Sequence, residues 1–187
     1  MSARIDLVQI REKQLSTKVL YQLSTSAAGI TGGTATKLLV NDRADVAAAA
    51  GADGVHLTSL SLPPETIRLT FGAGFLIGVS THSLAQAAAA RRGGSDFIVF
   101  GPVFDTPSKR QYGVSLGLTD FRKVASELAP FPVLALGGVT VDNVADCIDA
   151  GAAGIAAITM LNDRLQLDRI VGEIQARFEK ASRSKQT

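Results

Sequence analysis

The stretch Phe131–Thr159 constrains the fold most, because it holds two strand patterns with a helix pattern between them. Val133–Leu136 belongs to a continuous apolar run, which is typical of a strand buried on both faces of a parallel sheet. The hydroxyl of Thr140 is placed to cap the helix that follows, and Gly151 is placed to end it. A second apolar run, Ile155–Ile158, comes shortly after that glycine. The stretch therefore predicts a βαβ unit with parallel strands.

Both strand ends of this unit offer backbone groups for ligand binding. Gly137 and Gly138 follow the first strand, and Ile158 and Thr159 come at the end of the second. Backbone N–H groups at such ends can surround an anion, and (β/α)8 barrels commonly bind phosphate after their last two strands. A Gly-Gly pair is also typical of a plain tight turn. Its position late in the chain favours a phosphate site.

The same alternation of strand and helix patterns extends through the chain at a spacing of roughly 20 to 30 residues. Strands are predicted at 5–10, 37–40, 54–57, 76–79, 97–100, 133–136 and 155–158. Helices are predicted at 16–28, 42–50, 63–70, 83–92, 119–128, 141–150 and 163–181. The phrase Ala-Gly-Ala precedes a strand at both 50–52 and 150–152. This repetition predicts an α/β fold, a (β/α)8 TIM barrel that lacks its first strand and helix.

The length of 187 residues fits a single TIM-barrel domain over 1–187, with a frayed tail at about 182–187. A net charge of +2 without a basic stripe excludes a nucleic-acid partner, and no apolar run is long enough for a membrane span. Cys147 is the only cysteine and falls in a predicted helix, so we expect a buried, inert thiol. The absence of a signal peptide predicts a cytoplasmic protein. An open barrel edge would expose unpaired backbone groups, so we expect a covered edge or a homo-oligomer.

Polar side chains follow the first two predicted strands. Arg11 and Lys13 are two residues apart and can converge on one anion, although a solvated charged loop has the same composition. Asn41 and Asp42 follow the next strand, where either can cap a helix. The carboxylate of Asp42 is also a hard oxygen ligand suited to Mg²⁺.

The two histidines receive different predictions. His56 ends a buried strand, and we expect it to be a packing residue. His82 follows Ser80 and Thr81 at the end of a strand, where a group that titrates near neutrality suits acid/base catalysis. Helix capping is the competing explanation for these polar residues.

The longest loop, Gly101–Gly117, combines hydroxyl groups with a cation. Thr106, Ser108 and Lys109 lie close together in it and suit a phosphate or pyrophosphate. A loop of this length can act as a lid, and it can also be an ordinary surface loop.

Seven short motifs, in order along nearly the whole chain, carry a family resemblance. They are QIREK at 9–13, VNDR at 40–43, GADGVHL at 51–57, GVSTHS at 78–83, FGPVFDTPSK at 100–109, LALGGVT at 134–140 and GAAGIA at 151–156. With these motifs the chain resembles the thiamine phosphate synthase and thiazole tautomerase (TenI-like) superfamily, whose fold is a (β/α)8 barrel.

The resemblance implies a role for each motif. In the synthase, a hydroxymethylpyrimidine pyrophosphate ionises, and the nitrogen of a thiazole phosphate captures the pyrimidine cation to give thiamine phosphate and pyrophosphate. The implied pyrophosphate contacts are Gln9, Arg11, Lys13, Asn41 and Lys109, with Asp42 holding Mg²⁺. The implied thiazole phosphate contacts are Thr106, Ser108, Gly137, Gly138, Ile158 and Thr159, and Ser80 would lie near the reacting pyrimidine.

One position departs from the synthase pattern. Ser61 stands where the synthase has an aspartate that is a second Mg²⁺ ligand, and a hydroxyl does not replace a carboxylate charge. The segments 56–68 and 112–116 are more similar to the tautomerase branch, in which the acid/base histidine matches His82. Lys13 and Asp42, by contrast, are similar to the synthase.

These features predict an enzyme of thiamine biosynthesis that acts on thiazole phosphate, with a tautomerase favoured. The tautomerase would move a proton through His82 and need no cofactor. The alternative is an Mg²⁺-dependent synthase that also binds the pyrimidine pyrophosphate. A non-catalytic binder of a phosphate ligand is a third possibility.

Overall fold

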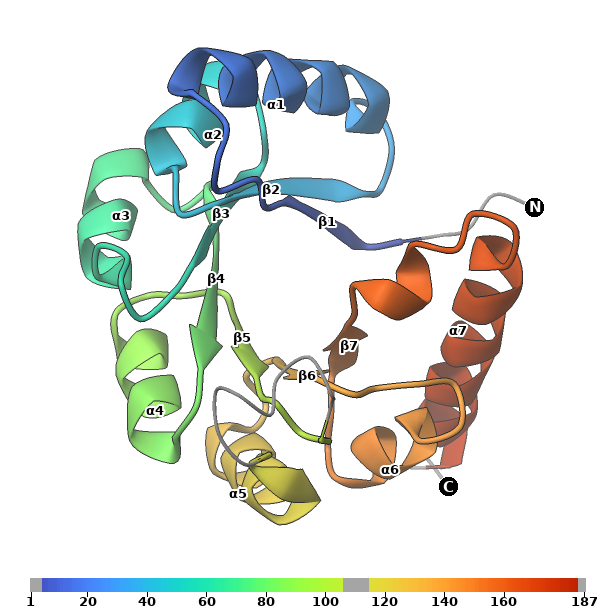
Figure 1. Cartoon of the computed structure of the whole chain (residues 1–187). Helices are drawn as coiled ribbons and strands as arrows, with labels where there is room; N and C mark the ends of the chain where they lie inside the picture. Colours follow the sequence, from blue (N-terminus) through green and yellow to red (C-terminus); the bar gives the residue numbers. More distant parts are fainter. Residues whose placement is uncertain (1–4, 106–114, 185–187) are drawn as a thin grey trace. The chain divides into compact units, whose positions relative to one another are not determined.

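The chain folds into two compact units of strands and helices. The computed structural model describes residues 5–105 and 115–184 (Figure 1). Of these residues, the N-terminal unit comprises 5–80 and 89–96, and the C-terminal unit comprises 81–88, 97–105 and 115–184. Each unit is described by itself below.

The N-terminal unit repeats one pattern, in which a strand is followed by a helix. Its elements are β1 (Leu7–Ile10), α1 (Thr17–Thr31), β2 (Lys37–Asn41), α2 (Ala44–Ala50), β3 (Gly54–Leu57), α3 (Pro64–Phe71) and β4 (Leu76–Thr81), whose last residue belongs to the other unit. The four strands are parallel and are neighbours in chain order. Apolar side chains without exposed surface fill the sheet, among them Leu38, Val40, Val55 and Ile77.

The C-terminal unit continues the pattern with three more parallel strands. Its elements are β5 (Phe97–Phe100), α5 (Gly117–Leu128), β6 (Val133–Leu136), α6 (Val144–Asp149), β7 (Gly154–Ala156), the 3₁₀ helix η2 (Thr159–Leu161) and α7 (Leu167–Ser184). Helix α4 (Leu84–Arg92) crosses the boundary between the units. The rings of Phe100 and Phe121 meet edge to face, with centroids 6.1 Å apart, and join β5 to α5.

The predicted helix ends at the two Ala-Gly-Ala phrases are confirmed. Gly51 and Gly151 have φ of 72° and 96°, values that glycine adopts without steric cost. In both cases the next alanine donates its N–H to the carbonyl five residues back, at 2.9 Å. The chain therefore turns in the same way from α2 into β3 and from α6 into β7.

Several predicted boundaries were wrong for local reasons. The helix predicted at 42 begins at Ala44, because Asp42 has φ of 65°, which is incompatible with a right-handed helix. The helix predicted at 141 begins at Val144, after a turn in which the Thr140 hydroxyl accepts from Asn143 N–H at 3.4 Å. The last predicted strand ends at Ala156 rather than at residue 158, and a 3₁₀ helix follows it.

Two further expectations concern the thiol of Cys147, predicted to be buried, and the outer strand of the sheet, predicted to be covered or paired with a second copy. Cys147 is fully buried, and burial, followed by the charge of Asp146, raises the pKa of its thiol to about 11. β1 stands first in the strand order of the sheet, and the apolar side chain of its Val8 is 37% exposed. Among the described residues, none of the helices has the length and apolar character to cross a membrane. The homo-oligomer stays a prediction.

Candidate active site

The ends of β1 and β2 place two amide side chains against each other. Gln9 and Asn41 lie on neighbouring parallel strands, and the Gln9 Nε2 group donates to Asn41 Oδ1 at 3.0 Å. Gln9 pairs with Leu39 in the sheet register, so Asn41 is two residues further on the same face. Both amides therefore keep donors for a ligand at this edge.

Arg11 and Lys13 follow β1 with exposed side chains. The positive charge of Arg11 reaches as far as His56, whose pKa it helps to lower. The convergence of Arg11 and Lys13 on one anion stays a prediction.

Asp42 and Ser61 lie side by side. The Ser61 hydroxyl donates to Asp42 Oδ1 in a short hydrogen bond. The backbone of Asp42 is fixed by its N–H, which donates to the His56 carbonyl at 2.9 Å, and Ser61 Oγ accepts from Thr58 N–H at 2.7 Å. The serine that departs from the synthase pattern therefore does stand next to the predicted metal ligand.

The donor set around Asp42 fits Mg²⁺ in one specific way. The described residues contain no group of three or more His, Cys, Asp or Glu side chains that could hold a metal. Mg²⁺ needs no such cage, since it is commonly bound by one or two carboxylates, several waters and substrate phosphates. Asp42, with the Ser61 hydroxyl beside it, offers one carboxylate of this kind, and its role as a metal ligand stays a prediction.

His56 is a packing residue, as predicted, and it also contacts a predicted site residue. Its side chain is 5% exposed, and its Nε2 lies 2.8 Å from Ser80 Oγ. Burial, and to a smaller extent the Arg11 charge, lower the pKa of His56 to about 4, so the ring is neutral at pH 7. No local sequence pattern predicts this contact, because it depends on the pairing of β3 with β4.

His82 in the C-terminal unit has one ring nitrogen fixed by the backbone. Its Nδ1 makes a short hydrogen bond with the Gly101 carbonyl. A carbonyl oxygen only accepts, so this bond requires the proton on Nδ1 and leaves Nε2 with a lone pair in the neutral ring. The helix-capping role belongs instead to Ser83, whose Oγ accepts from Gln86 N–H at 3.2 Å. His82 is exposed and available to act through Nε2.

The two glycines after β6 have a packing role that the sequence did not reveal. Gly137 and Gly138 have φ of 97° and 65°. A methyl group on Gly137 would lie 2.6 Å from Pro102 Cβ, and one on Gly138 would lie 2.7 Å from Phe104 Cβ. The segment after β5 therefore packs directly on the glycine backbone. Phosphate binding there stays a prediction.

The remaining predicted ligand contacts differ in their position. Ile158 is 65% exposed and directly precedes η2, which Thr159 begins, so both lie just beyond β7. Thr106, Ser108 and Lys109 lie outside the described residues.

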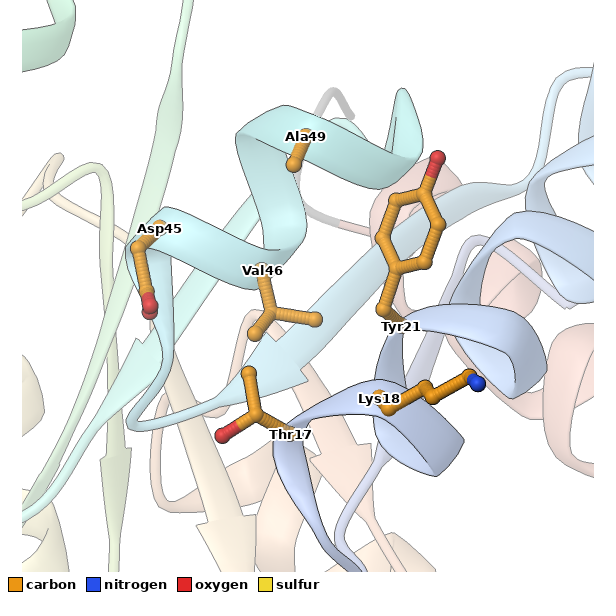
Figure 2. Close-up of a pocket in the computed structure, with 6 residues that line it drawn as sticks. All are labelled: Thr17, Lys18, Tyr21, Asp45, Val46 and Ala49. Atoms are coloured by element: carbon orange, nitrogen blue, oxygen red, sulfur yellow. The ribbon is translucent and has the colours of Figure 1, made fainter.

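A surface groove of about 460 Å³ lies between α1 and α2 (Figure 2). Its lining is mostly apolar and comes from three residues of each helix, Thr17, Lys18 and Tyr21 of α1 and Asp45, Val46 and Ala49 of α2. Its polar groups are partly satisfied, since Arg43 donates to Thr17 Oγ1 at 3.1 Å and to Asp45 at 2.7 and 2.8 Å. The groove lies between helices, and none of the predicted site residues lines it.

Comparisons with known proteins agree with the motifs at the strand ends. The sequence matches the family model described as thiamine monophosphate synthase over residues 1–161. The chain belongs to this family. A relative from Geobacter sulfurreducens is 43% identical over 161 residues, which cover 86% of this chain and 75% of the relative. The thiamine-phosphate synthase of Methanoculleus marisnigri is 41% identical and covers 82% of this chain and 72% of its own length.

A solved structure supports the fold as well. It is a thiamine phosphate pyrophosphorylase from Pyrococcus furiosus, which is 29% identical and superimposes with a TM-score of 0.84, covering 96% of this chain and 85% of that chain. The α/β fold of the TIM-barrel type, with seven strands described here, is thus confirmed. The chain is an enzyme of the thiamine phosphate synthase family and of thiamine biosynthesis.

Proposed function

We propose that this chain is a thiamine phosphate synthase, which reverses the preference for a tautomerase drawn from the sequence. The observation that carries the proposal is the arrangement around Asp42, a carboxylate held beside Ser61, with the Gln9–Asn41 amide pair next to it on β1 and β2. A metal-bound pyrophosphate needs such oxygen ligands and donors, whereas a proton transfer does not. The relatives named thiamine-phosphate synthase support the same conclusion.

In this reaction the bond between the pyrimidine methylene carbon and the pyrophosphate oxygen breaks, and its electron pair leaves with pyrophosphate. The thiazole nitrogen then gives its lone pair to the methylene carbon. Arg11 and Lys13 would bind the leaving group and offset its growing negative charge, and the Gln9–Asn41 pair would orient it. Asp42 would hold Mg²⁺, which when bound stabilises the charge on the departing pyrophosphate.

The second substrate would bind at the C-terminal unit. Thiazole phosphate fits the backbone groups after β6 and β7, at Gly137, Gly138, Ile158 and Thr159, where the N–H of a strand end can meet an anion. By the family resemblance, Thr106 and Ser108 would also contact thiazole phosphate, and Lys109 would contact the pyrophosphate. Ser80 would lie beside the pyrimidine.

The test is an assay of the purified protein with pyrimidine pyrophosphate and thiazole phosphate, with and without Mg²⁺, read by mass detection of thiamine phosphate. The variant is Asp42→Asn, because asparagine tolerates the positive φ at this position while the charge is lost. We expect Mg²⁺-dependent product from the wild type and a loss of about 100-fold or more in the variant, in line with removal of one strong electrostatic contact.

The matched control is Asp149→Ala, which removes an exposed aspartate of α6 and should keep full activity. Wild-type protein that makes no thiamine phosphate under these conditions contradicts the proposal. Equal losses in the two variants would show that Asp42 has no special role.

A tautomerase is the second candidate, and one observation favours it. The Gly101 carbonyl fixes the proton of His82 on Nδ1, so that Nε2 is ready to accept a proton from a substrate. Isomerisation of the thiazole phosphate that survives a chelator, and that His82→Ala abolishes, would establish this activity. Affinity for thiazole phosphate without either turnover would indicate a binder.

A further inference from the structure

The sheet register brings His56 and Ser80 together across a glycine. His56 of β3 pairs with Gly78 of β4, and Ser80 is two residues beyond Gly78 on the same face of the strand. Gly78 itself has no side chain that would stand between the imidazole and the serine. His56 Nε2 therefore reaches Ser80 Oγ at 2.8 Å.

The two partners differ in how firmly they are held. All four residues of β3 are buried, and the strand is paired on both sides, with β2 and β4. The His56 side chain is 5% exposed, whereas Ser80 is only partly buried. A serine hydroxyl rotates freely unless a partner selects one orientation. The ring is thus the fixed member of the pair, and the hydroxyl is the member that can meet a ligand.

We propose that His56 is a positioning residue that holds the Ser80 hydroxyl in one orientation for the reacting pyrimidine. This inference rests on the proposed synthase function, because it concerns the same substrate. The ring itself touches no substrate in this proposal. Its effect on the reaction passes through Ser80, so substitutions at the two positions should not be independent.

A double-mutant cycle on kcat tests this dependence. Ser80→Ala removes the hydroxyl, and His56→Phe keeps a ring but removes the nitrogen. We expect each single variant to lose roughly ten-fold in kcat, as for one positioned hydrogen bond, and the double variant to be no worse than about two-fold below the poorer single variant. Because orientation affects the reacting state more than substrate binding, KM should change less than kcat.

A conservative variant separates positioning from packing. The amide of glutamine in His56→Gln can reach the place of the imidazole Nε2, so this variant should recover to within about three-fold of wild-type kcat. The packing control is Ser24→Ala, since Ser24 is a fully buried serine of α1 whose hydroxyl has no partner among the described residues. It should leave kcat unchanged, and thermal unfolding of every variant should show a single folded state.

Long-range proton–nitrogen NMR of the imidazole gives a readout that does not need turnover. In the free protein, Ser80→Ala should shift the His56 Nε2 resonance, and Ser24→Ala should not. An unchanged resonance, or kcat losses that multiply in the double variant, would overturn the inference while leaving the synthase intact. A wild type without synthase turnover would instead overturn the proposed function, and the positioning role with it.

Discussion

The strand ends of the two units are built in different ways. In the N-terminal unit, side chains contact one another in pairs, as Gln9 does with Asn41 and Ser61 with Asp42. In the C-terminal unit, the backbone makes the corresponding surfaces, through the Gly101 carbonyl at His82 and the packed glycine backbone at Gly137 and Gly138. Substitutions should therefore remove chemistry in the first unit and disturb the local fold in the second.

The largest effect is expected from a substitution in the turn of Gly137 and Gly138, where the backbone itself forms the surface. Gly138→Ala adds a methyl group 2.7 Å from Phe104 Cβ at a residue with φ of 65°, so steric overlap and backbone strain act together. We expect a loss of about 3 kcal/mol in the free energy of unfolding, measured by urea denaturation.

The matched control is Gly172→Ala in α7. Apart from the two adjacent residues and the backbone of the helix itself, no heavy atom of the described residues lies within 4 Å of the added methyl group, and the residue is helical. This variant should gain about 0.5 to 1 kcal/mol, the usual advantage of alanine over glycine in a helix. Similar stabilities for the two variants would contradict the view that the Gly137–Gly138 turn is fixed by packing.

Part of this contrast was visible in the sequence. The strands at 54–57, 97–100 and 133–136 were predicted with the observed bounds, because each is a short apolar run next to a glycine, a proline or a polar residue. The polar residues at the strand ends were also found, since side chains after parallel strands gather at one edge. The features that could not be predicted from the sequence depend on contacts between residues that are distant along the chain.

Two examples show why such contacts escaped. The Gly-Gly pair has a steric reason only when the segment at Pro102 packs on it, and no local pattern contains that approach. The contact between His56 and Ser80 needs the register of β3 on β4, which apolar runs do not specify. A search for a glycine at the paired position could have suggested it.

The pair of His56 and Ser80 in the N-terminal unit should make the stability of the chain depend on pH. His56 has a pKa of about 4 in the folded chain and 6.5 in the unfolded chain. Between these values the unfolded chain binds a proton that the folded chain does not, so stability falls as the pH drops below 6.5. The wild type should lose about 2 kcal/mol between pH 7 and pH 5 from this group.

The same measurement on His56→Gln isolates the contribution of the histidine, because all other titratable groups are present in both proteins and affect the free energy of unfolding of each alike. The free energy of unfolding from urea titrations at pH 7, 6 and 5 should fall less steeply in the variant than in the wild type. Parallel curves would mean that the pKa of His56 is the same in the folded and the unfolded chain, and that burial does not lower it.

The smallest expected effect concerns the pair of Asp42 and Ser61. Ser61→Asp places a second carboxylate next to the first, where the serine hydroxyl now donates to Asp42 Oδ1. Two carboxylates repel each other without a cation and bind Mg²⁺ better than one. We expect the thermal midpoint to fall in a chelator and the affinity for Mg²⁺, measured by calorimetry on the protein alone, to rise by about ten-fold, or 1.4 kcal/mol.

Leu60→Asp is the control, because it adds the same charge to the same turn at a side chain that is 92% exposed. A gain in Mg²⁺ affinity in both variants would reduce the effect to general attraction by negative charge. A gain in Ser61→Asp alone would mean that the wild-type site depends on a pyrophosphate to complete its ligands. The pair of Asp42 and Ser61 would then supply only part of the Mg²⁺ ligands, and the negatively charged pyrophosphate of the substrate would supply the rest.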